Sequence, residues 1–78
     1  MPHYHFHIHE DDRYYEDEAG RDLADGDAAR EEAVETVAAL AKDAFVAGSA
    51  EILTVDVIEG GKPYLRISVS LDFSMERQ

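Results

Sequence analysis

The sequence contains no cysteine, which excludes disulfide bonds and thiolate metal sites. Any bound metal ion would therefore need nitrogen and oxygen ligands. No apolar run approaches the roughly 20 residues of a membrane-spanning helix, and the first residues lack the basic and apolar regions of a signal peptide. We therefore expect a cytoplasmic protein with no membrane-spanning segment.

Basic residues are also scarce, since seven lysines and arginines stand against eighteen aspartates and glutamates. The formal net charge of −11 repels nucleic-acid phosphates and anionic membrane surfaces. Neither nucleic acid nor membrane lipid is therefore an expected partner. Solubility is the simplest explanation of this charge. The concentration of acidic residues from Glu10 to Glu35 also suits an acidic antagonist of a basic partner protein.

The chain is short, and its 78 residues predict a single domain spanning residues 1–78. A chain of this size buries only about 60% of the surface that it exposes when unfolded. We therefore expect marginal stability unless a partner subunit adds buried area.

Histidine alternates with large apolar residues from His3 to His9, the pattern of a strand with one buried face. The turn-prone run Glu10–Asp12 follows, and a strand-like composition resumes at Arg13–Glu16. These features predict a β-hairpin over about residues 3–17.

Two further alternating segments flank a pair of glycines and predict a second hairpin over about residues 51–72. A three-residue loop at residues 59–61 would place two apolar pairs opposite each other, Val55 with Leu65 and Leu53 with Ile67. Residues 74–78 continue neither strand and are expected to fray.

Between the hairpins, residues 28–47 contain neither proline nor glycine, and small or apolar residues recur every three or four positions. Asp25 is placed to cap the start of a helix and Gly48 to end it. These features predict a helix over about residues 26–47. Its apolar stripe is rich in alanine, which implies close approach to a sheet; it comprises Ala29, Ala33, Val37, Leu40, Ala41 and Ala44.

The resulting order is ββαββ, which predicts an α+β fold: a four-stranded antiparallel sheet with one helix packed across one face. The other face then has no helix. Because Tyr14 and Tyr15 are adjacent in a strand, one of them must point to this uncovered face. The predicted interaction residues on it are His3, His5, His7, His9, Asp56, Ile58, Tyr64 and Arg66.

Several short motifs occur in a definite order: Met1-Pro2-x-Tyr4-x-Phe6-His7, then Asp17-x-x-Gly20, then Ala28-Ala29-Arg30-x-x-Ala33 in the predicted helix. In this combination the chain resembles a family of short uncharacterised bacterial proteins, grouped as a domain of unknown function, that open M-P-x-Y-x-F-H. The resemblance covers about residues 1–71. It implies no activity, substrate or cofactor. His7 falls on a position typical of the family, whereas histidine is not expected there at positions 3, 5 and 9.

Histidines two residues apart on a strand can converge on one Zn²⁺ or Ni²⁺ ion. The span from His3 to His9 is about 20 Å, so all four histidines cannot hold a single ion. The predicted ligands are His5 and His7, joined by His3 or His9, by a carboxylate such as Asp56, or by a second subunit. The same row could instead sense pH, because imidazoles titrate near neutrality.

The sequence contains no recognisable nucleophile turn and no phosphate-binding glycine loop, so we expect neither an enzyme nor a bound cofactor. The preferred hypothesis is a protein-interaction module, homodimeric through the uncovered sheet face or an exposed strand edge, or bound to another protein. The alternatives are a small metal-binding protein and an acidic antagonist of a basic protein.

Overall fold

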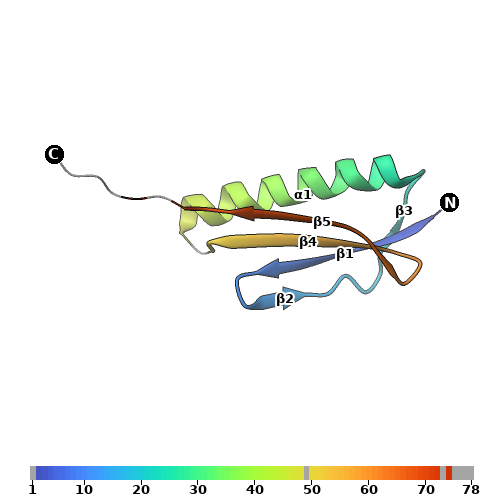
Figure 1. Cartoon of the computed structure of the whole chain (residues 1–78), viewed down its shortest axis with the longest axis horizontal. Helices are drawn as coiled ribbons and strands as arrows, with labels where there is room; N and C mark the ends of the chain where they lie inside the picture. Colours follow the sequence, from blue (N-terminus) through green and yellow to red (C-terminus); the bar gives the residue numbers. More distant parts are fainter. Residues whose placement is uncertain (1, 49, 73, 75–78) are drawn as a thin grey trace.

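The computed structural model describes residues 2–48, 50–72 and 74 and shows an α+β fold, with one helix packed on an antiparallel sheet (Figure 1). The elements are β1 (His3–Glu10), β2 (Arg13–Tyr15), β3 (Arg21–Asp22), α1 (Gly26–Ala47), β4 (Ile52–Glu59) and β5 (Lys62–Ser70). Both hairpins and the helix between them are thus confirmed. Most of the segment expected to fray, residues 74–78, lies outside the described residues.

The sheet contains five strands, so the prediction of four was wrong in number. The order along the sheet is β2-β1-β4-β5, and β3 pairs with β1 beside β2. The reason is an interruption at residues 16–20, after which the outer strand of the first hairpin resumes as β3. β1 and β4 therefore form the centre of the sheet, and β5 forms one edge.

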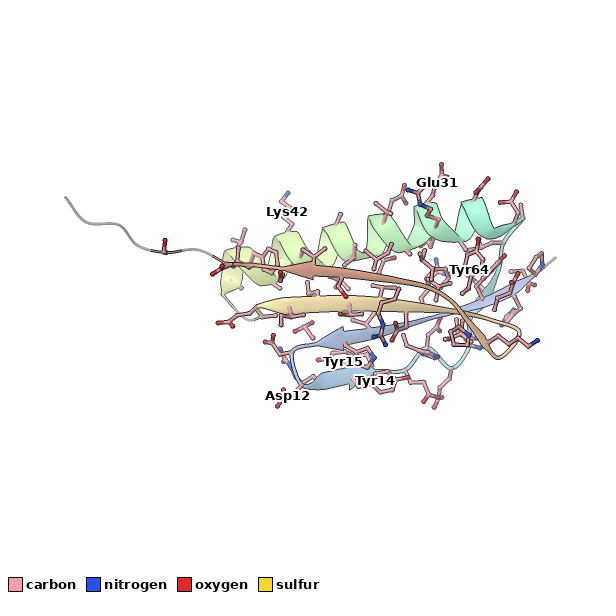
Figure 2. The ribbon with its side chains drawn as sticks, viewed as in Figure 1. Asp12, Tyr14, Tyr15, Glu31, Lys42 and Tyr64 are labelled. Carbon is pink, nitrogen blue, oxygen red and sulfur yellow. The ribbon has the colours of Figure 1, made fainter. Side chains whose placement is uncertain are left out.

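The core lies between α1 and the central strands. Leu53, Val55 and Val57 on β4 have no exposed surface, because the period of two turns all three toward the helix. Ala33 on α1 is also fully buried, which lets the helix approach the sheet closely. Figure 2 shows Lys42 on the side of α1 that points away from the sheet. The predicted apolar stripe of α1 is therefore confirmed.

Capping interactions of neighbouring residues determine where α1 begins and ends. The Asp25 carboxylate accepts a hydrogen bond of 2.9 Å from the Ala28 N–H. Gly48 ends the helix with φ 69°, and its N–H points to the carbonyl groups of Ala44 and Phe45. Glycine is strongly favoured at a position with this left-handed backbone conformation. The predicted caps are thus confirmed.

Strand β3 pairs with the start of β1 and places Arg21 beside the buried Phe6 ring. The guanidinium carbon of Arg21 lies 5.3 Å from the centroid of the Phe6 ring. Its Nη1 also donates a hydrogen bond of 2.6 Å to the Glu32 carboxylate on α1. Arg21 therefore connects the edge of the sheet to the helix above the Phe6 ring.

The register between β4 and β5 differs from the prediction by two residues. The structure places Val55 opposite Ile67 and Leu53 opposite Val69. The expected pairs, Val55 with Leu65 and Leu53 with Ile67, are wrong because the turn has two residues and a bulge follows it.

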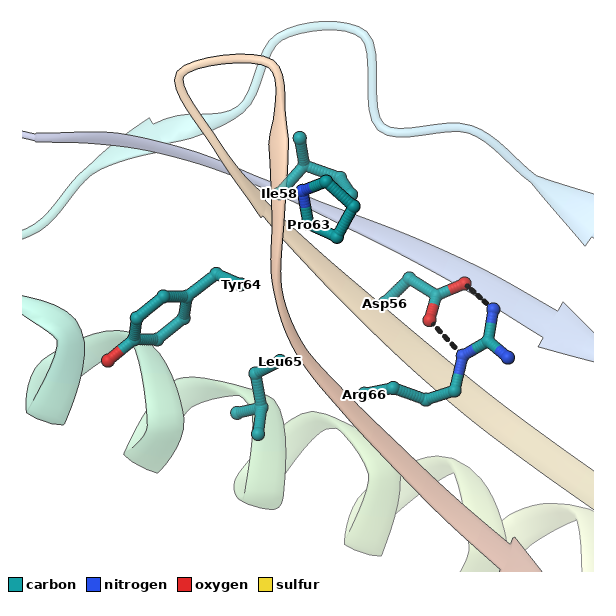
Figure 3. Close-up of a pocket in the computed structure, with 6 residues that line it drawn as sticks. All are labelled: Asp56, Ile58, Pro63, Tyr64, Leu65 and Arg66. Atoms are coloured by element: carbon teal, nitrogen blue, oxygen red, sulfur yellow. Dashed lines mark hydrogen bonds and ion pairs between the residues drawn. The ribbon is translucent and has the colours of Figure 1, made fainter.

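This bulge also moves Tyr64 to the other face of the sheet. Ile58 pairs with Pro63 and Val57 with Leu65, which leaves Tyr64 as the extra residue on β5. Its ring lies 6.0 Å from that of the buried Tyr4. Figure 3 shows the Tyr64 side chain pointing toward the helix. The prediction that Tyr64 belongs to the uncovered face is therefore wrong.

Among the described residues, no helix combines the length and the apolar character that crossing a bilayer requires.

Candidate functional site

The sheet face opposite α1 carries polar and aromatic side chains, and we call it the open face. Strand alternation and register bring most of the predicted interaction residues together on it. Tyr14, rather than Tyr15, is the tyrosine that contributes to this face, because its ring lies against two histidine rings. The described members of the open face are His3, His5, His7, His9, Tyr14, Thr54, Asp56, Ile58, Arg66 and Ser68.

Imidazole and phenol rings form a continuous packed row along this face. The ring centroids of His3 and His5 are 5.0 Å apart, and those of His5 and His7 are 6.1 Å apart. The Tyr14 ring lies 5.9 Å from His7 and 4.7 Å from His9. The row is therefore held by mutual ring contacts rather than extended into solvent.

An ion pair crosses the open face between β4 and β5. Arg66 donates to both carboxylate oxygens of Asp56, from Nε at 2.5 Å and from Nη2 at 3.1 Å. His9 Nε2 also lies 3.2 Å from Asp56 Oδ2. The hydrogen bond from Arg66 lowers the pKa of the Asp56 carboxyl below its ordinary value. The positive charge of Arg66 is therefore satisfied within the chain.

Asp17 joins the interrupted edge of the sheet to β1. One of its carboxylate oxygens accepts from the Phe6 N–H at 3.1 Å and the other from the Gly20 N–H at 3.0 Å. Its own N–H donates to His7 Nδ1 at 3.1 Å. These bonds serve the part of β1 that neither β2 nor β3 reaches. The Asp17 side chain thus replaces a missing strand residue.

The pKa of Asp17 reflects two opposing effects. Partial burial raises the pKa of this carboxyl, but the hydrogen bonds from Gly20 and Phe6, together with nearby positive charge such as that of Arg21, lower the pKa overall. Because the pKa is depressed in the folded state, Asp17 stabilises the fold above its ordinary pKa. That contribution is lost as the pH falls through the depressed value.

Gly20 is required where the chain passes beside β1. Its φ is +67°, and a β-carbon there would lie 2.6 Å from His3 Nε2 and 2.7 Å from the Tyr4 carbonyl oxygen. The Tyr4 oxygen belongs to the backbone and cannot move aside cheaply. Only glycine therefore fits this position.

His3 contacts a hydrogen-bond acceptor with each ring nitrogen. Nδ1 lies 2.7 Å from Asp22 Oδ1, and Nε2 lies 2.9 Å from the Ala19 carbonyl oxygen. Both acceptors are satisfied only when both nitrogens carry protons, so the contacts favour the imidazolium form. The hydrogen bond to Asp22, followed by that to Ala19, raises the pKa of His3 above its ordinary value near 6.5.

We expect NMR titration of the imidazole signals to give His3 a pKa above 6.5, and Asp22→Asn to return it toward that value. Since the pKa is raised in the folded state, the stabilisation is complete below pH 6.5. It is lost as the pH rises through the folded pKa. A wild-type His3 pKa at or below 6.5 would contradict the doubly bonded imidazolium.

The predicted metal ligands His5 and His7 lie next to each other, but three histidines of the row, His3, His7 and His9, already contact neighbouring groups through ring nitrogens. His7 Nδ1 accepts from the Asp17 N–H, which places its proton on Nε2. Binding a metal through Nε2 would reverse this tautomer and break the bond to Asp17. Within residues 2–48, 50–72 and 74, no three His, Asp or Glu side chains form a group suited to a metal ion. The metal-binding hypothesis therefore stays a prediction, without a preformed site to support it.

A hollow of about 340 Å³ lies beside the bulge of β5 (Figure 3). Its two charged members, Asp56 and Arg66, are bonded to each other. The rest of its lining is apolar or aromatic: Ile58, Pro63, Tyr64 and Leu65. Such a surface suits contact with an apolar side chain better than proton transfer.

In the sequence, Asp17 and Gly20 stand out only as the motif Asp17-x-x-Gly20. The spacing Asp-x-x-Gly is itself a turn signal, because an aspartate side chain can accept from a backbone N–H a few residues later. The bond from Asp17 to Phe6 carries no comparable signal, since it joins residues eleven apart in the chain.

Comparison with known proteins matches one family model, described as a domain of unknown function (DUF6894), to residues 3–70. No curated protein and no solved structure matches the chain. The match confirms the resemblance to a domain of unknown function, and it covers most of the sequence. The chain therefore belongs to the DUF6894 family.

Proposed function

We propose that this chain is a non-enzymatic protein-interaction module that binds a polypeptide strand along the free edge of β5. The observation that supports the proposal is the length of this edge. β5 contains nine residues, and its outer side pairs with no strand of the part of the chain that the structure describes. A long exposed edge is a template for pairing with another strand.

The two edges of the sheet differ in length and charge. The opposite edge is built from β2 and β3, of three and two residues, with acidic residues between and around them. Residues 60–71, by contrast, form the longest stretch of the chain without Asp or Glu. Their only charged residues are Lys62 and Arg66, and Arg66 is bonded to Asp56. A strand from an acidic chain that approaches β5 therefore meets no negatively charged side chain of residues 60–71.

The hydrogen-bonding pattern shows which backbone groups of β5 are free. Leu71 N–H donates to the Glu51 carbonyl oxygen at 2.8 Å, so Leu71 faces β4. Backbone groups of successive residues point to alternate sides of a strand. The N–H and C=O groups of Arg66, Ser68 and Ser70 therefore point outward along the free edge.

The apolar side of β5 is incompletely covered. Leu65, Ile67 and Val69 face the helix but are only partly buried, whereas their neighbours on β4 are fully buried. A further strand beside β5 would remove more of this apolar surface from water. Backbone pairing and apolar burial would thus act together at the same edge.

The test compares two substitutions at the middle of this edge. Ser68→Pro removes the outward N–H without removing a bond between β4 and β5, whereas Ser68→Ala keeps that N–H. Both variants lose the contact between the Ser68 and Thr54 hydroxyls, so they are matched in that respect. We expect native mass spectrometry of untagged protein, isolated gently from native lysate, to show complexes with a second copy or with another protein for S68A but not for S68P. Equal complex formation by the two variants would contradict strand addition at β5.

A further inference from the structure

We infer that the strand that pairs with β5 is β5 of a second copy of this chain, antiparallel to the first and related to it by a two-fold axis at Ser68. This inference rests on the proposed function and names its partner. Three observations support it. The backbone groups of Arg66, Ser68 and Ser70 point outward, β5 has a bulge at Tyr64, and residues 60–71 contain no Asp or Glu.

The register follows from which residues can pair. Outward-facing residues form hydrogen-bonded pairs in an antiparallel ladder, so Arg66, Ser68 and Ser70 must oppose one another. An axis at Ser68 satisfies this condition, because Ser68 opposes itself and Arg66 opposes the partner's Ser70. Each of the three pairs then forms two backbone hydrogen bonds. Every described outward group between the bulge and the end of β5 is used.

An axis one residue earlier fits less well. With the axis at Ile67, Arg66 would oppose the partner's Ser68, but Ser70 would oppose the partner's Tyr64. Tyr64 is the extra residue of the bulge, where the ladder is interrupted. An axis between two residues would bring helix-facing side chains opposite open-face side chains, which the sheet pleat forbids.

The side chains also match about the axis at Ser68. On the helix side, Ile67 opposes the partner's Val69 and Leu65 opposes the partner's Leu71, so the partly buried apolar residues meet one another. On the open face, the two Arg66 side chains oppose serines and not each other. Each Arg66 also keeps its bond to Asp56 of its own copy. The repulsion between two copies of net charge −11 therefore comes from residues away from this edge, where salt screens it.

A two-fold axis through a residue makes that residue face its own copy, and this property allows a specific test. Ser68→Lys places two ammonium groups opposite each other, and Ser68→Glu places two carboxylates there. We expect each variant to raise the dimer dissociation constant by about tenfold or more. An equimolar mixture of S68K and S68E should restore the wild-type constant, because an ammonium group of one copy then faces a carboxylate of the other.

The control is the same charge change on α1. Ala39→Lys and Ala39→Glu alter an exposed helix position and should leave the dimer constant unchanged. Sedimentation velocity gives the constants, native mass spectrometry identifies the heterodimer by mass, and circular dichroism checks that each variant is folded. Dimers of S68K and S68E as stable as wild type, or a mixture without heterodimer, would overturn the two-fold axis at Ser68.

A wild-type protein that stays monomeric at high micromolar concentration would also overturn the inference. The proposed function would survive that result if complexes with another protein form with S68A and not with S68P. It would fall together with the inference if both variants form the same complexes.

Discussion

Ala33→Leu should lower the melting temperature of the protein by roughly 12–24 °C. Ala33 has no exposed surface and belongs to the core cluster that also contains Val55 and Val57. Three extra carbon atoms at this position must displace the helix or the strands, since protein interiors hold few voids. Overpacking of this kind costs about 3 kcal/mol at the upper end of its usual range, and each kcal/mol shifts Tm by roughly 4–8 °C in a domain of this size.

Ala39→Leu is the matched control, because Ala39 lies on the exposed side of the same helix. Leucine and alanine have similar helix propensities, so the expected change in Tm is only about 1–2 °C. Thermal unfolding followed by circular dichroism measures both effects. Equal shifts for the two variants would show that α1 does not approach the sheet as closely as the alanine stripe indicates.

Asp17→Ala should destabilise the protein by about 2 kcal/mol, because the substitution leaves two backbone N–H groups without their acceptor. These are the N–H groups of Phe6 and Gly20. The corresponding fall in Tm is roughly 10 °C. Asp17→Asn keeps one acceptor oxygen, so its effect should lie between those of wild type and D17A.

Amide hydrogen exchange provides the specific measurement for Asp17. We expect the Phe6 and Gly20 amides to exchange faster in D17A by more than the global loss of stability explains. Asp12→Ala, at an exposed turn position, removes the same charge and should leave both amides protected. Similar exchange in D17A and D12A would mean that charge, and not the two hydrogen bonds, sets the contribution of Asp17.

The side of the sheet on which each residue of β1 and β4 lies could be predicted, because side chains alternate strictly along a strand. The histidine row and Asp56 therefore fell on one face, as expected. The same logic failed at Tyr64, since a bulge adds one residue and reverses the alternation beyond it. A bulge depends on how a neighbouring strand pairs, and local sequence contains no reliable signal for it.

Some features of the candidate site could likewise be predicted from the sequence, and others could not. The sequence identified the open face and the possibility of binding at an exposed strand edge. It did not identify which edge is free, because strand order depends on how distant segments pack together. Nor did it identify the bond from the Asp17 side chain to the Phe6 N–H, which forms only after β2 and β3 leave a gap beside β1.

The sequence by itself determined the order of hairpin, helix and hairpin, the ends of the helix at Asp25 and Gly48, and the buried faces of β1 and β4. These features depend on capping, backbone freedom and periodicity within a few residues. Only the tertiary structure decided the register of β5, the division of the outer strand into β2 and β3, and the position of β5 at the free edge. Each of these is a choice between long-range pairings, and such a choice is settled by packing of the whole chain, because local preferences are equally compatible with several alternatives.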